Sequence, residues 1–117
     1  MDAAAIVLDK PVPWDRYPHI RPICLPPRGN IENYVNSSAM VSGWGITTTG
    51  RASQVLRKGQ VMVLPPEQCS NAKVYGEKFT SNMLCAGTED SSVNVCTGDS
   101  GGPLGKQPER VICSSGN

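Results

Sequence analysis

Near its end the chain carries the stretch Cys96-Thr97-Gly98-Asp99-Ser100-Gly101-Gly102-Pro103-Leu104. Glycine accepts positive φ and the close approach of another chain segment, so glycines on both sides of Ser100 suit a sharply turned, exposed serine. In such a turn the N–H groups of Gly98 and Ser100 can point the same way and donate to an oxygen that becomes negative during acyl transfer. The stretch therefore predicts a serine nucleophile with its oxyanion hole, the alternative being a glycine-rich surface turn capped by Asp99.

A serine hydroxyl is a poor nucleophile unless a base activates it, and that base is normally a histidine oriented by a buried carboxylate. The sequence has a single histidine, His19, between Pro18 and Ile20. These neighbours are typical of a connecting loop. We therefore interpret His19 as a surface or linker residue and not as the base.

Four further segments, in the same order along the chain, resemble the trypsin-like serine proteases, which have the chymotrypsin fold. In that family the corresponding segments are a strand end, the linker between the two barrels, the strand before the autolysis loop and the entry to the specificity pocket. The four segments are Ala5-Ile6-Val7-Leu8-Asp9-Lys10-Pro11-Val12, Arg21-Pro22-Ile23-Cys24-Leu25-Pro26, Val41-Ser42-Gly43-Trp44-Gly45 and Asn82-Met83-Leu84-Cys85-Ala86-Gly87. The resemblance covers residues 2 to 104.

The resemblance implies an all-β fold, a partial chymotrypsin-like double β-barrel. Residues 1–38 would form the end of the N-terminal barrel and the inter-barrel linker, and residues 39–117 an incomplete C-terminal six-stranded barrel with one short helix. A double-barrel protease has roughly 200 to 250 residues, whereas this sequence has 117. We therefore expect a fragment of a catalytic domain, with exposed strand edges and low stability of its own.

The residue pattern itself predicts short strands and loops rather than long helices. Residues 55–56 and 61–64 have strand character, and Gly59 between them is placed for a β-bulge. One short helix is expected from Pro65 to about Ala72, because proline is favoured in the first helical turn. Residues 47–51, Thr-Thr-Thr-Gly-Arg, are expected to form an exposed loop.

By the same resemblance, Ser100 takes the place of the nucleophile, and the N–H groups of Gly98 and Ser100 take that of the oxyanion hole. Asp2 stands where the triad aspartate is found, the alternative being a solvated terminal acid. Asp99 would pair with a new N-terminal amine after zymogen cleavage, which makes it an activation switch. The family order is His, then Asp, then Ser, and no histidine precedes Asp2, so we expect no turnover by this chain alone.

In the family the residue six positions before the nucleophile forms the base of the primary specificity pocket, and here that residue is Asn94. An aspartate at this place would stabilise a substrate Lys or Arg by a charged hydrogen bond. Because Asn94 is neutral, we expect the intact parent to prefer polar or uncharged side chains, or to have no productive pocket. The position shifts by one residue if residues 90–93 carry an insertion.

Five cysteines in 117 residues are ordinary for an extracellular protein and many for a cytosolic one. The resemblance implies a disulfide between Cys69 and Cys85, and a bond from Cys24 to a propiece or light chain. Cys96 has a family partner further along the chain, for which Cys113 is the remaining candidate. We therefore expect a secreted protein, although the first twelve residues do not read as a signal peptide.

The composition excludes several classes of partner. Charged residues make up 18% of the sequence and its net charge is +1, so no basic patch indicates nucleic acid. No apolar run approaches about 18 residues, so no membrane-spanning helix is expected. The motifs imply no cofactor and no metal. The triplet Asn36-Ser37-Ser38 is a glycosylation sequon, which has meaning only in the secretory pathway.

Two functions from different classes stay open. The first is a secreted serine endopeptidase that cleaves protein or peptide substrates through an acyl-enzyme on Ser100, this chain being its incomplete catalytic half. The second is a non-catalytic serine protease homologue that acts as a binding or regulatory module. The intact Gly-Asp-Ser-Gly-Gly stretch and Asp2 favour the first function, while the missing histidine and the neutral Asn94 favour the second.

Overall fold

The computed structural model describes residues 3–27, 29, 31–71, 73 and 75–106, and the chain forms two compact units. In the first unit the described residues, 3–27, are irregular chain with turns. The N–H groups of Trp14 and Tyr17 donate to the carbonyls of Val12 and Pro13 at 3.0 and 3.2 Å. Arg21 donates from Nη1 to the carbonyl of Trp14 at 2.9 Å. The second unit, Gly29–Pro108, contains every helix and strand of the described residues.

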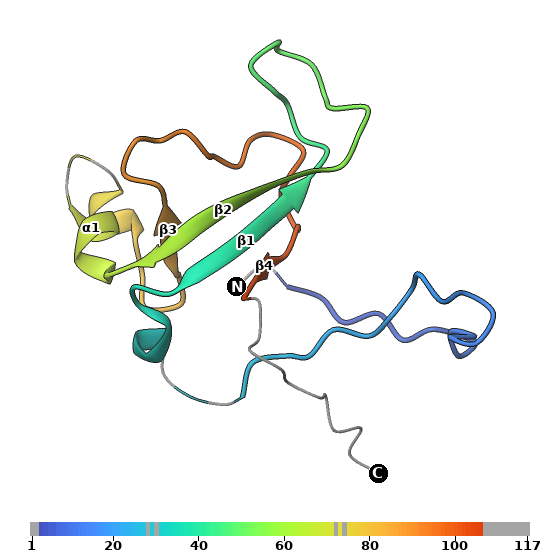
Figure 1. The fold of residues 1–117 in the computed structure, drawn as a ribbon. Coiled ribbons are helices and arrows are strands. Elements are labelled where there is room, and N and C mark those ends of the chain that lie inside the picture. The colour runs from blue at the N-terminus through green and yellow to red at the C-terminus, as the bar shows by residue number, and fades with distance from the viewer. Residues whose placement is uncertain (1–2, 28, 30, 72, 74, 107–117) are drawn as a thin grey trace. The chain divides into compact units, whose positions relative to one another are not determined.

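A four-stranded antiparallel sheet in the order β3-β2-β1-β4 forms the centre of the second unit. Its strands are β1 (Ser38–Gly43), β2 (Arg57–Leu64), β3 (Cys85–Gly87) and β4 (Leu104–Gly105). Figure 1 shows β1 and β2 as a long central pair, with β3 beside β2. Because β3 and β4 are short, the sheet depends mainly on this central pair.

The core lies on one face of the central pair. Alternate residues of a strand point to opposite faces of a sheet, and Val61 and Val63 of β2 are buried together with Ala39 of β1. Two partly buried side chains from β1 and a distant loop, Val41 and Val93, pack against this cluster. The cluster is small, so it removes little apolar surface from water and stabilises the unit only modestly.

The prediction of short strands is confirmed, but the predicted division at Gly59 is wrong. Residues 57–64 form one continuous strand, in which Gly59 lies opposite Val41 in regular antiparallel register. Residues 55–56 lie outside any strand. Gly59 forms no bulge and instead leaves room for the side chain of Val93.

In the part of the chain that the structure describes, three short helices accompany the sheet: η1 (Ile31–Tyr34), α1 (Pro66–Ser70) and η2 (Gly76–Lys78). The helix predicted after Pro65 is confirmed as α1, with proline in its first turn. It ends at Ser70, and Ala72 lies outside the described residues.

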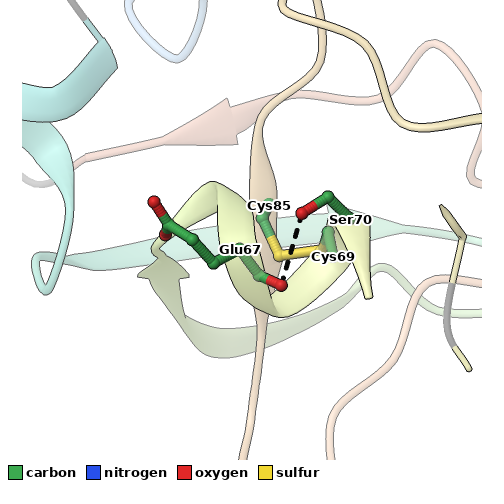
Figure 2. Close-up of a disulfide and its surroundings, with 4 residues drawn as sticks. All are labelled: Glu67, Cys69, Ser70 and Cys85. Atoms are coloured by element: carbon green, nitrogen blue, oxygen red, sulfur yellow. Dashed lines mark hydrogen bonds between the residues drawn. A yellow bond between two sulfur atoms is a disulfide. The ribbon is translucent and has the colours of Figure 1, made fainter. Parts of the chain in front are cut away.

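A disulfide joins α1 to the sheet, as the resemblance implied. Cys69 of α1 bonds to Cys85 of β3 across a sequence separation of 16, with 5.9 Å between the two Cα atoms (Figure 2). Cys85 is buried, and the hydroxyl of Ser70 donates to the carbonyl of Glu67 within the helix at 3.4 Å. A helix this short is not stable in isolation, so the bond to β3 is what keeps it in place.

A hairpin connects β1 to β2 beyond the ends of both strands (Figure 1). An isolated bridge between Ile46 and Ala52 closes it. The predicted loop at residues 47–51 is confirmed as the hairpin tip, where the N–H of Gly50 donates to the carbonyl of Thr47 at 2.9 Å. The start of this hairpin lies next to the segment that carries Ser100.

Replacing both bonded cysteines, in the variant Cys69→Ser/Cys85→Ser, is expected to lower the free energy of unfolding by about 3 kcal/mol, because the loop is then open in the unfolded chain. Urea denaturation followed by circular dichroism measures the change. The matched control is Cys96→Ser, which removes a free thiol among the described residues and should leave the midpoint unchanged. Equal destabilisation by both variants would contradict this account of the bond.

Candidate active site

Ser100 lies in two successive β-turns that share Asp99. The N–H of Asp99 donates to the carbonyl of Cys96, and the N–H of Gly102 donates to the carbonyl of Asp99, both at 2.9 Å. The third residue of each turn has positive φ, 95° at Gly98 and 83° at Gly101, as type II turns require. Ser100 is exposed, so the stretch has the sharply turned, accessible serine that its glycines predicted.

The carboxylate of Asp99 fastens these turns to the end of the sheet. Its Oδ1 accepts from the N–H of Gly45 at 2.7 Å, and its Oδ2 accepts from the N–H of Cys96 at 3.0 Å. A third bond runs alongside, from the N–H of Ile46 to the carbonyl of Thr97 at 2.9 Å. Asp99 therefore links its own turn to a segment 54 residues earlier in the chain.

Two glycines make this approach possible. A Cβ atom on Gly43 would lie 2.0 Å from Asp99 Oδ1, and one on Gly45 would lie 2.4 Å from Asp99 Cγ. The resemblance implied only that Gly43 and Gly45 belong to the strand before the autolysis loop, and it did not reveal this contact with Asp99. Residues two apart on an extended chain share a face, so the Gly-x-Gly spacing after a strand is the signal that could have found it.

The amides that would form the oxyanion hole are not engaged by the protein. Within the part of the chain that the structure describes, neither the N–H of Gly98 nor that of Ser100 donates to a protein acceptor, and the Ser100 hydroxyl makes no hydrogen bond. Both donors remain available to an oxygen from outside. Their role as an oxyanion hole stays a prediction.

The predicted specificity residue and the serine share one cleft. Asn94 and Ser100 both line a cleft of ≈ 500 Å³, whose walls include the apolar side chains of Phe79, Leu84 and Val95. Asn94 is exposed. An apolar cleft with a few polar groups is the usual form of a small binding site, so the geometry is compatible with a pocket for one substrate side chain.

Val93 fixes the segment that leads into Asn94. Its side chain packs on Gly59 of β2 so closely that a Cβ atom on Gly59 would lie 2.4 Å from Val93 Cγ1. The same side chain contacts the core of the sheet. The position of Asn94 therefore depends on a glycine in the middle of a strand, a contact that no local sequence pattern reveals.

The loop before Val93 is held by its own side chains. Asp90 Oδ1 accepts from the N–H of Ser92 at 3.0 Å, and Thr88 Oγ1 accepts from the N–H of Val93 at 3.4 Å. Hydrogen bonds from the hydroxyl and N–H of Ser92, followed by one from Thr88, lower the pKa of Asp90. A lowered pKa means that the fold favours the ionised form of Asp90, so this contribution to stability is present at neutral pH and falls as the carboxylate is protonated in acid.

Asp2, which the resemblance implies is the triad aspartate, lies outside the described residues, so its role stays a prediction. His19 belongs to the first unit, where its ring lies edge-on to that of Tyr17 with 6.1 Å between ring centroids. The interpretation of His19 as a loop residue agrees with this exposed stacking position.

The remaining cysteines differ in state. Among the described residues Cys96 is an exposed free thiol, and Cys113 lies outside them. Cys24 takes part in a disulfide, and its implied bond to a propiece stays a prediction. No group of three or more metal-ligating side chains occurs in the described part of the chain.

Comparison with protein families agrees with the arrangement around Ser100. The family model for trypsin matches residues 1–113. The chain belongs to the trypsin family. Its four-stranded antiparallel sheet with one short α-helix is accordingly part of a chymotrypsin-like barrel, as the sequence resemblance predicted.

Several curated proteins are similar to this trypsin-family chain. It is 36% identical over 112 residues to transmembrane protease serine 11C of Mus musculus, covering 95% of the chain and 25% of the relative. It is 42% identical over 91 residues to coagulation factor XII of Sus scrofa, covering 74% and 15%. It is 37% identical over 104 residues to ovochymase of Halocynthia roretzi, covering 88% and 6%.

The chain therefore spans a quarter or less of the length of these relatives. They share with it a trypsin-like serine protease domain. In the described residues there is no helix with the length and apolar character that a membrane crossing needs.

The contact between Gly59 and Val93 can be tested by a double-mutant cycle. Gly59→Ala is expected to destabilise the chain by about 1–3 kcal/mol, because the added methyl group overlaps Val93. Adding Val93→Ala should relieve the overlap, so that the double variant loses at least about 1 kcal/mol less than the sum of the two single losses. Thermal unfolding of the three variants measures the coupling.

Gly105→Ala is the matched control, because Gly105 is also a strand glycine and no atom lies within 4 Å of a Cβ placed there. It should change the unfolding midpoint little. Strictly additive losses at Gly59 and Val93 would show that the two residues do not meet.

Proposed function

We propose that this chain carries the nucleophile of a secreted serine endopeptidase that cleaves protein or peptide substrates. The observation behind the proposal is the arrangement of Ser100, exposed in a double turn held by Asp99, with two unengaged N–H groups beside it. A buried serine could not reach a substrate carbonyl carbon. The membership of the trypsin family supports the same reaction class.

In the proposed reaction, Ser100 Oγ attacks the carbonyl carbon of a peptide bond and loses its proton to a base. The carbonyl oxygen becomes an oxyanion, to which the N–H groups of Gly98 and Ser100 donate, each such donor contributing about 3 kcal/mol. The amine leaves with a proton, and an acyl-enzyme on Ser100 remains. Water then hydrolyses the ester and restores the serine.

The second unit, which carries Ser100, contains no histidine that could serve as the base. His19 stacks on Tyr17 in the first unit, and we keep Asp2 as the orienter. A histidine from outside these 117 residues would complete the site in the intact parent. The chain by itself is therefore expected to show no turnover.

The activation role of Asp99 is compatible with its observed bonds. An ionised carboxylate has about four acceptor positions, and the N–H groups of Gly45 and Cys96 use two of them. Asp99 also lines a cleft of ≈ 570 Å³ with Asn94 and the hairpin. We propose that a new N-terminal ammonium enters this cleft after zymogen cleavage.

An extracellular location is part of the proposal. The structure contains a disulfide between Cys69 and Cys85. Disulfides persist in oxidising compartments and are rare in cytosolic proteins. No nucleic acid or membrane partner is proposed for this segment.

The second candidate is a non-catalytic homologue that acts as a binding or regulatory module. The neutral Asn94 and the lack of a histidine before Asp2 in the sequence favour it. A module of this kind has no chemical need for two free N–H groups beside an exposed serine, so the endopeptidase is the better-supported function.

Acylation of Ser100 distinguishes the two functions. In the activated parent, a fluorophosphonate probe is expected to label Ser100, and Ser100→Ala should abolish labelling and lower peptide hydrolysis by about 10⁶-fold. Ser81→Ala is the matched control, because Ser81 is also exposed. An activated parent with unlabelled Ser100 and no hydrolysis would establish the regulatory module instead. Strong labelling of the chain alone would contradict its proposed inactivity.

Substrate preference depends on Asn94 in this proposal. Asn94→Asp in the activated parent is expected to raise kcat/KM for Arg and Lys substrates by about tenfold to a hundredfold, because a charged hydrogen bond contributes about 1.5–3 kcal/mol. Asn94→Ala, which adds no charge, should give no such gain. Trypsin-like efficiency of the unaltered parent toward Arg and Lys would overturn the assignment.

A further inference from the structure

The triplet Asn36-Ser37-Ser38 is the one Asn-x-Ser/Thr sequence in the chain, and the serine chemistry makes no use of it. An asparagine in such a triplet accepts an oligosaccharide only where it is reachable and where the hydroxyl two residues later is free to assist.

Asn36 projects from the turn that joins η1 to β1. Its φ of 64° places it in the left-handed region, which asparagine tolerates better than most residues, and its N–H donates to the carbonyl of Val63 at 2.8 Å. The backbone of the turn is therefore fixed to β2. Asn36 is exposed, and within the described residues its carboxamide makes no hydrogen bond, so the acceptor nitrogen is unoccupied.

The two serines of the triplet have different surroundings. The hydroxyl of Ser37 donates to the carbonyl of Tyr34 and is half-buried. Ser38 is exposed at the first position of β1, and the next residue, Ala39, is buried on the opposite face. The hydroxyl that the sequon requires, that of Ser38, is thus the one that no described group engages.

The triplet and the contact with Asp99 lie at opposite ends of β1. The triplet precedes β1, whereas Gly43 and Gly45 at the other end of the strand hold Asp99. At a rise of about 3.3 Å per residue, β1 separates the two ends by roughly 20 Å.

We propose that Asn36 is a glycosylation site, an inference that rests on the secretory route proposed above. The donor is a lipid-diphosphate-linked oligosaccharide. Asn36 Nδ2 forms a bond to the anomeric carbon of the first sugar, the bond from that carbon to the diphosphate oxygen breaks, and the lipid diphosphate leaves as Nδ2 loses one proton. No oxidant or reductant takes part.

To test the proposal, the full chain is expressed in mammalian cells behind a cleavable secretion signal. Both the total cell lysate and the medium are analysed. Peptide N-glycosidase F is expected to increase the mobility of the protein and to convert Asn36 to aspartate, which peptide mass spectrometry detects. Asn36→Gln and Ser38→Ala should both lose the shift. Ser38→Thr should keep it, and Ser37→Ala is the matched control that should also keep it.

A second version of the chain, with an added Asn-Gly-Thr acceptor directly after the signal, reports entry into the secretory pathway. Modification of this acceptor with Asn36 unmodified would overturn the proposal. Because the signal is supplied, this failure would leave the proposed endopeptidase function unaffected. Loss of the shift in Ser37→Ala but not in Ser38→Ala would likewise contradict the assignment of the hydroxyl.

Discussion

The serine site depends on the hydrogen bonds that the carboxylate of Asp99 accepts. This carboxylate accepts one hydrogen bond from Gly45 at the end of the central strand pair and another from Cys96 in its own turn. Both partners are backbone N–H groups, so the bonds do not depend on the side chains of the donor residues. They do require that residues 43 and 45 have no side chain, because a Cβ at either would overlap Asp99. The turn that exposes Ser100 is in this way built onto the most regular part of the fold.

Two close contacts with glycines position residues 93–99. The side chain of Val93 packs against Gly59 at one end of this segment, and that of Asp99 packs against Gly43 and Gly45 at the other. Asn94 directly follows Val93 and Ser100 directly follows Asp99, and both line the same cleft. The distance between pocket and nucleophile is therefore controlled from the sheet, and not by the loop alone.

Much of this arrangement could be predicted from the sequence because it depends on local chemistry. The glycines around Ser100 predict turns with positive φ, Pro66 predicts the start of α1, and the family resemblance implied the bond between Cys69 and Cys85. The roles of Gly45 and Gly59 could not be predicted in this way. Their contacts join residues 54 and 34 positions apart in the chain, so no spacing rule contains them, and Gly59 was assigned to a bulge for lack of that information.

Amide hydrogen exchange on the chain and on Asp99→Ala tests the central role of this carboxylate most directly. The account predicts slow exchange at Gly45 and Cys96 in the unaltered chain and loss of that protection in Asp99→Ala. The N–H of Val63 in β2, which donates to the carbonyl of Ser37 just before β1 at 2.9 Å, should stay protected in both. Unchanged protection of Gly45 and Cys96 without the carboxylate would contradict the account, as would loss of protection at Val63.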